Sequence, residues 1–204
     1  MLYDIAEIIK GKIAAQGLPY IETLAGLVQV ETVYKKKDNK NLIEKRYPIY
    51  CPITDPCPPG KTIPLVPDLK KKSIFYFQNN GNVTFNSRDR GYTNFTADLW
   101  LVGWLNPKAL GSPDCSITAP IIAQLLNILD LPAFNDVGGV YTKIKIRPNR
   151  LLTKEPVIFA KYKYTKFHSL LEYPYDYFAV QLFVDFSIHE NCINDFIANN
   201  PIDC

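Results

Sequence analysis

Apolar and polar positions repeat with helical spacing in two parts of the chain. Near the N-terminus the apolar residues of the first helical repeat are Leu2, Ile5, Ile9 and Ile13. Recurrence every three or four positions is the pattern of an amphipathic helix, which Gly17 and Pro19 should end. A second apolar stripe runs from Ile121 to Leu129, so a second helix is expected between Pro120 and Asp130, with Ser116 or Thr118 as its cap.

Alternation with period two predicts strands over much of the remaining chain. Residues 99–105 are apolar at every position, so their strand should be central and covered on both faces. The expected fold is one α+β domain spanning residues 1–204, a mainly antiparallel sheet with an N-terminal helix and one central helix packed on it. The predicted strands are 20–34 with a break at Gly26, 41–50, 74–77, 83–85, 95–105, 141–147, 157–164 and 177–188.

A proline-rich insertion at residues 51–72 interrupts this pattern. Its prolines rule out a helix and remove amide donors that an inner strand would need. A long loop of this kind is either a solvent-facing insertion or a contact surface. A second polar stretch, residues 87–94, is also expected to be a loop. The candidate interface residues in the two segments are Pro56, Pro58, Pro59, Arg88, Asp89 and Arg90.

Composition narrows the class of protein without naming a function. The 26 aromatic residues, 13 Tyr, 11 Phe and 2 Trp, favour half-buried sheet surfaces over helix bundles. A net charge of +3 is too small for the whole chain to indicate nucleic-acid binding, so such an argument must be local. No stretch reaches the roughly 18 apolar residues of a membrane span, and the charged N-terminus differs from a signal peptide, so no membrane partner is expected.

Five cysteines without a C-x-x-C pair, and only two histidines, make a structural zinc site improbable on the sequence. Cys51 and Cys57 could form a bridge in an oxidising compartment. The absence of a secretion signal instead favours reduced thiols. Neither a metal nor a cofactor is expected.

A search for catalytic motifs finds no phosphate-binding glycine loop, nucleophile elbow or zinc-protease helix. The best local cluster is His168, Glu172 and Asp176, which could act as acid and base in a small hydrolase-like enzyme. This segment has the composition of a solvated connection between strands, however. The sequence therefore predicts a protein that is not an enzyme, with no catalytic residues assigned.

The sequence also contains alternating basic residues. If the strands at 141–147 and 157–164 paired, their cations would form one positive stripe, able to follow a phosphate backbone or to contact acidic residues of a partner. A solvated sheet face is the simpler interpretation. The residues of this stripe are Lys143, Lys145, Arg147, Lys161 and Lys163.

The order of elements resembles that of the tail terminator and head–tail connector proteins of tailed bacteriophages. The similarity lies in the helix at residues 4–9 leading to the strand at 27–30, and in the strand at 96–102 leading to the helix at 121–129. The resemblance implies a structural virion protein, made in the host bacterial cytoplasm. It would form a sixfold or twelvefold homo-oligomeric ring that contacts portal, connector or tail proteins and passes DNA. The compact family plan lacks the proline-rich insertion.

Overall fold

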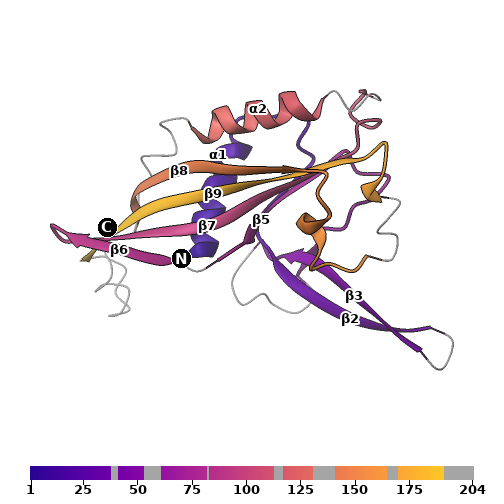
Figure 1. The fold of residues 1–204 in the computed structure, drawn as a ribbon, viewed down its shortest axis with the longest axis horizontal. Coiled ribbons are helices and arrows are strands. Elements are labelled where there is room, and N and C mark those ends of the chain that lie inside the picture. Colours follow the sequence, from indigo (N-terminus) through magenta and orange to yellow (C-terminus); the bar gives the residue numbers. More distant parts are fainter. Residues whose placement is uncertain are drawn as a thin grey trace.

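The computed structural model describes residues 1–37, 41–52, 61–81, 83–112, 117–130, 141–164 and 170–190. These residues form an α+β fold, as predicted (Figure 1). The helices are α1 (Leu2–Ala14), α2 (Thr118–Leu129) and the short 3-10 helix η2 (Pro156–Phe159). The strands are β1 (Thr23–Leu27), β2 (Gln29–Lys37), β3 (Asn41–Tyr50), β4 (Ile63–Pro64), β5 (Ser73–Asn79), β6 (Thr84–Asp89), β7 (Tyr92–Leu105), β8 (Tyr141–Thr153) and β9 (Asp176–His189).

Six strands form the main sheet, in the order β1-β5-β7-β9-β8, with β6 paired to the first half of β7. Only the β1–β5 pair of this sheet is parallel. Strand β7 pairs with β9 along its whole length, from Tyr92↔His189 to Leu105↔Asp176, and this confirms its predicted central position. A smaller sheet, β2-β3-β4, extends away from the main one (Figure 1).

The two helices α1 and α2 cover one face of the main sheet. Ile5, Ile9 and Ile13 of α1 are completely buried, which is the outcome that their spacing predicts. Burying each such side chain stabilises the fold by roughly 1.5–3 kcal/mol. Alternate residues of β9 face this core, as predicted; they are Phe178, Val180, Leu182, Val184 and Phe186.

A second core lies on the opposite face, towards one end of the sheet. It joins η2 to β3, β5 and the C-terminal half of β7, and Trp104 Nε1 donates a hydrogen bond to the Leu170 carbonyl (2.8 Å). The predicted strand at 157–164 is wrong, because Pro156 begins a 3-10 turn. Neighbouring residues Ile158 and Phe159 are both buried in this core, whereas a strand would direct them to opposite faces.

Gly26 does not break a strand, contrary to the prediction. It lies within β1, and the strand ends instead before Val28, whose amide donates to the Phe77 carbonyl (2.9 Å). The glycine allows the Glu7 carboxylate from α1 to approach the backbone closely, and a Cβ here would displace that carboxylate. A glycine in a sequence can therefore mark a packing contact rather than a chain reversal.

The polar stretch at 87–94 is also not a loop. It forms the ends of β6 and β7, and Asp89 pairs with Tyr92 across a two-residue turn. Both turn residues, Arg90 (φ 48°) and Gly91 (φ 82°), have left-handed backbones, as a type I′ hairpin requires. All residues of β6 are exposed, so its polar composition does not distinguish it from a loop.

Thr118 does not cap α2. The cap position is Ile117, which makes no side-chain capping bond, while Thr118 Oγ1 donates to Asp176 Oδ2 (2.5 Å) at the start of β9. In the proline-rich insertion, Ile63–Pro64 forms the short edge strand β4. The proposed interface residues Pro56, Pro58 and Pro59 lie outside the described residues.

Candidate functional site

The face of the main sheet opposite α1 and α2 is only partly covered. The second core covers one end, and the other end, where β7 begins and β9 finishes, carries half-exposed polar residues. Directly paired residues share a face in antiparallel strands, so Asn94, Ser187 and Lys143 form one row across β7, β9 and β8. This open, polar end of the sheet is the candidate functional surface.

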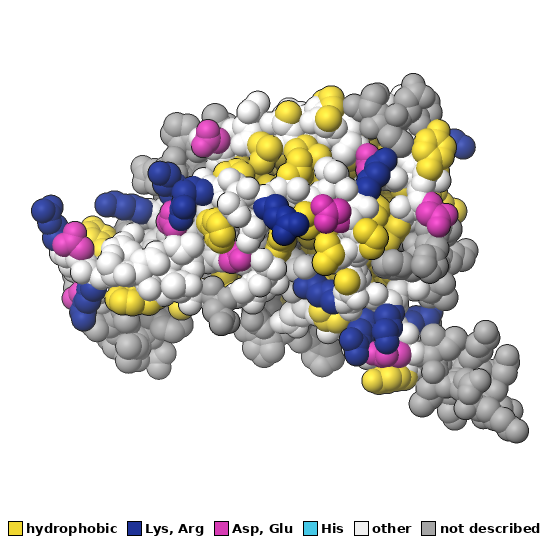
Figure 2. Space-filling view, in the orientation of Figure 1, with side chains coloured by type: hydrophobic (Ala, Val, Ile, Leu, Met, Phe, Trp, Pro, Cys, Tyr) yellow, Lys and Arg dark blue, Asp and Glu magenta, His cyan; other side chains and the backbone are white. Residues whose placement is uncertain are grey.

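The five predicted basic residues do not form one stripe. Lys143, Lys145 and Arg147 are exposed on β8, where they alternate with buried Ile144 and Ile146. β8 pairs with β9, however, and not with the segment at 157–164. Figure 2 shows Lys and Arg side chains separated by Asp, Glu and uncharged groups over the visible sheet face.

Lys161 and Lys163 lie next to the small sheet instead. Lys163 forms an isolated antiparallel bridge with Arg46 of β3, and its Nζ pairs with Glu44 (2.6 Å). Lys161 Nζ lies 5.6 Å from the centre of the Tyr162 ring. Hydrogen bonds from Lys163 outweigh the effect of desolvation and keep the pKa of Glu44 below its ordinary value. The predicted stripe is therefore divided between two surfaces.

Arg147 is also neutralised locally. Its guanidinium forms a bidentate ion pair with Asp185, with Nε–Oδ2 and Nη2–Oδ1 distances of 2.7 and 2.8 Å. Thr96 Oγ1 donates to the same carboxylate (2.6 Å). Burial acts to raise the pKa of Asp185, but the hydrogen bonds from Arg147 and Thr96 outweigh it, so the pKa is lowered. The two residues lie 38 positions apart in the sequence, so only the pairing of β8 with β9 brings them together.

A polar pocket of about 300 Å³ opens at the tip of this surface. Ser187 Oγ donates to Asn94 Oδ1 (2.6 Å), and Asn94 Nδ2 donates to Ser87 Oγ (3.1 Å). Lys143 Nζ lies 5.6 Å from the centre of the Tyr92 ring, within the range of a cation–π contact. The lining residues are Asp89, Arg90, Tyr92, Asn94, Lys143 and Ser187.

Three of the predicted candidates, Asp89, Arg90 and Lys143, thus meet in one pocket, although the sequence placed Lys143 in a separate feature. A fourth, Arg88, points to a different contact and pairs with Glu190. Reasoning from sequence missed Tyr92, Asn94 and Ser187. The polar alternation in β7 and β9 was the available signal, but only the strand register brings these residues together.

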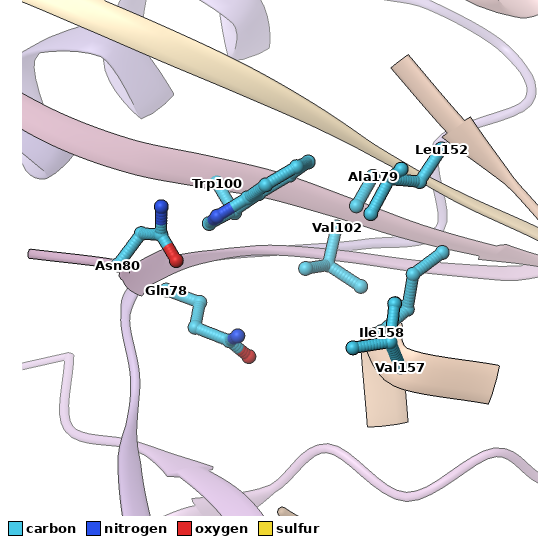
Figure 3. Close-up of a pocket in the computed structure, with 8 residues that line it drawn as sticks. All are labelled: Gln78, Asn80, Trp100, Val102, Leu152, Val157, Ile158 and Ala179. Carbon is cyan, nitrogen blue, oxygen red and sulfur yellow. The ribbon is translucent and has the colours of Figure 1, made fainter. Parts of the chain in front are cut away.

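A second pocket, of about 100 Å³, lies between η2 and the sheet. In Figure 3, Val157 and Ile158 of η2 lie on one side of the pocket. Trp100 and the amides of Gln78 and Asn80 lie on the other side. Tyr162 Oη donates to Gln78 Oε1 (2.8 Å). The volume is below the roughly 300–1,000 Å³ of ligand sites, so this pocket suits a single side chain rather than a cofactor.

The cluster considered as a possible acid–base site is not assembled within the described residues. His168 lies outside them, and Glu172 is exposed. Asp176 is buried and accepts hydrogen bonds from Thr118 Oγ1 (2.5 Å) and the Tyr177 amide (2.9 Å). These contacts give Asp176 a structural role at the junction of α2 and β9.

No group of three or more His, Cys, Asp or Glu side chains in the described ranges could hold a metal ion. Cys51 is disulfide-bonded, and the other four cysteines lie outside the described residues. The expectation of reduced thiols is therefore wrong for Cys51. That expectation followed from the cellular compartment, whereas a disulfide depends on which cysteines the fold brings together.

The chain was compared with family models, curated proteins and solved structures. None of them matches. No helix in the described part of the chain is long and apolar enough to cross a membrane.

Proposed function

We propose that this protein is a structural component of a tailed-bacteriophage virion, a tail terminator or head–tail connector that assembles into a sixfold or twelvefold ring. In this role it is not an enzyme and needs no cofactor. It is made in the host cytoplasm, and its partners are further copies of itself and the adjoining portal, connector or tail proteins. The order of elements, from α1 through the β2–β3 hairpin to α2 and β9, supports the proposal.

The observation that carries the proposal is the β2–β3 hairpin. It is paired over nine positions, from Gln29↔Ile49 to Lys37↔Asn41, and extends away from the main sheet (Figure 1). Strand β4 pairs only with the base of β3, at Ile49↔Pro64 and Tyr50↔Ile63. Beyond this pairing and the bridge between Arg46 and Lys163, no third strand pairs with the rest of the hairpin among the described residues. A two-stranded hairpin is marginally stable alone in water, so contact with another molecule would stabilise it.

The exposed side chains of the hairpin suit such a contact. Val30, Thr32 and Tyr34 lie on one face of β2, and Val30 and Tyr34 are 45% and 63% exposed. Apolar side chains in a row on a projecting element are typical of interaction surfaces. A hairpin that packs on a different surface of the next copy makes a head-to-tail contact, and this type of contact closes into rings.

The edge of β8 is less suited to assembly. It carries exposed Lys143, Lys145 and Arg147 and a proline at 148. Its pairing with β9 shifts register at Thr142 and again at Asn149. Charges, proline and bulges on an edge strand prevent it from pairing with another chain. The proposal therefore assigns the contact between subunits to the hairpin.

The test is the mass of the protein in solution, measured by light scattering behind a sizing column over a range of concentrations. A particle of six or twelve copies of the 23.2 kDa chain, or a rise towards that mass with concentration, supports the ring. Tyr34→Ser should weaken assembly by about tenfold or more, since large aromatic side chains dominate interface energies.

Val157→Ser is the matched control, because Val157 is 61% exposed but lies on η2. This variant should assemble like the wild-type protein. A 23.2 kDa monomer at the highest concentration, unaffected by either substitution, would contradict the homo-oligomeric ring.

A further inference from the structure

The polar pocket at the tip of the sheet combines features of an anion site. We infer that it binds a phosphate group of duplex DNA, with Arg90 and Lys143 as the cations and Asn94 as a neutral donor. This activity goes beyond the proposed ring function and does not depend on it, because all lining residues belong to one chain.

The charges of the pocket favour an anion. Its lining contains two cations, Arg90 and Lys143, and one carboxylate, Asp89. Within the described residues neither cation forms an ion pair, whereas Arg88 and Arg147 each have an acidic partner. Both cations are therefore available to a ligand, and an arginine fork can contact a phosphate through two parallel hydrogen bonds.

The neutral groups support one of the cations, Lys143, and add a donor. Asn94 accepts from Ser187 and donates one Nδ2 hydrogen to Ser87, which leaves its second Nδ2 hydrogen to face the pocket. The Tyr92 ring supports Lys143 from one side and meets the His189 ring at 4.9 Å. An ammonium above a ring keeps its donors and can still reach an oxyanion.

The backbone at Arg90 provides an independent argument. Its φ of 48° lies in the left-handed region, which is unfavourable for most residues, and type I′ turns favour Asn, Asp or Gly there. A residue that strains the turn yet places a guanidinium at the pocket indicates a role for the side chain itself.

The open form of the pocket favours a polymer over a small enclosed ligand. It lies at the end of the sheet, and Lys145 continues the cationic row along β8, two residues from Lys143. Two residues of a strand span about 6.8 Å. A backbone that carries regularly spaced phosphates can occupy the pocket and the next cation together.

The experiment is fluorescence anisotropy of the full chain with a labelled 30-base-pair duplex between 50 and 200 mM NaCl. Neutralising two or three phosphates gives a slope of log affinity against log salt of about −1.8 to −2.7, or roughly a 12- to 40-fold loss across this range. Lys143→Gln and Arg90→Asn should each make the slope less steep by about 1.

Arg90→Asn separates binding from folding, because asparagine suits the turn. It should leave the melting temperature unchanged or raised while weakening DNA binding. Lys108→Gln is the control. It removes the same charge from an exposed residue just beyond the opposite end of β7 and should bind DNA like the wild-type protein.

Three results would overturn the inference: no DNA binding at 50 mM salt, equal binding by the two pocket variants and the Lys108 variant, or equal affinity for polyglutamate. None of them bears on the mass of the assembly. Conversely, if the protein is a monomer and both pocket variants lose DNA binding, the ring is contradicted and the phosphate site is supported.

Discussion

Gly26 of β1 and Glu7 of α1 lie in direct contact, since a Cβ atom on residue 26 would be 1.7 Å from Glu7 Oε1. This oxygen accepts a hydrogen bond from Tyr50 Oη (2.8 Å), and the other carboxylate oxygen pairs with Lys10 Nζ (2.6 Å). Burial, followed by the bond to Glu7, raises the pKa of Tyr50. The contact joins the first helix to β1 and β3.

Gly26→Ala should displace the Glu7 carboxylate and break its bonds to Tyr50 and Lys10. Loss of these partly buried, charge-assisted bonds is expected to lower the free energy of unfolding by about 1–3 kcal/mol. Urea denaturation at neutral pH measures the change. Gly11→Ala is the matched control, since nothing lies within 4 Å of its added Cβ, and alanine within a helix should stabilise by about 0.5–1 kcal/mol. Equal effects at both positions would refute the packing explanation.

The ion pair between Asp185 and Arg147 should make stability depend on pH in the acidic range. The pKa of Asp185 is lower in the folded protein than its ordinary value of 3.8. The stabilisation is therefore present above pH 3.8 and is lost as the pH falls through the folded-state pKa. Because Arg147 is half exposed, the expected contribution is only about 0.5–1 kcal/mol.

Asp185→Asn tests this dependence by urea unfolding at pH 7 and pH 2. The substitution should destabilise at pH 7, and the difference should shrink as the pH is lowered towards 2, because protonation of the native carboxyl removes the ion pair. A destabilisation that persists unchanged at pH 2 would mean that the side chain acts through packing or neutral hydrogen bonds.

Tyr20 should affect stability at alkaline pH. The side chain is 8% exposed, and its hydroxyl has no hydrogen-bond partner in the described part of the structure. Burial raises its pKa to about 12 from an ordinary value of 10.0. Its contribution to stability is thus complete below pH 10 and declines as the pH rises from 10 to 12.

Tyr20→Phe keeps the ring that packs on Phe75 and removes the buried hydroxyl. The variant should equal the wild-type protein at pH 7 or exceed it by up to about 1 kcal/mol, and should lose less stability between pH 10 and 12. Unfolding in urea across this range provides the measurement. A loss above 1 kcal/mol at pH 7 would show that the hydroxyl makes a needed bond.

The elements with strong local periodicity were predictable from sequence. The stripe of α1, the continuous apolar run in β7 and the alternation in β9 each record which side chains are removed from water. Burial imposes the period of the backbone on the residues, so one segment suffices to identify its own type and its buried face.

Short or polar elements were not predictable in this way. Pro156 begins a 3-10 turn within an alternating segment, and β6 has no buried side chain to mark its period. The predicted basic stripe was wrong for a related reason. Five cations that share a pattern in sequence are divided by strand pairing, which places Lys163 against β3 and Lys143 against β9.

The sequence by itself determined the α+β class, the two helices and the central and final strands, because these depend on contacts that repeat within one segment. Tertiary structure alone decided which strands are neighbours, that Asp185 receives Arg147, and that Arg90 meets Lys143 in one pocket. Those pairings join residues separated by tens of positions. The register between strands sets them, and no periodicity within a single strand encodes that register.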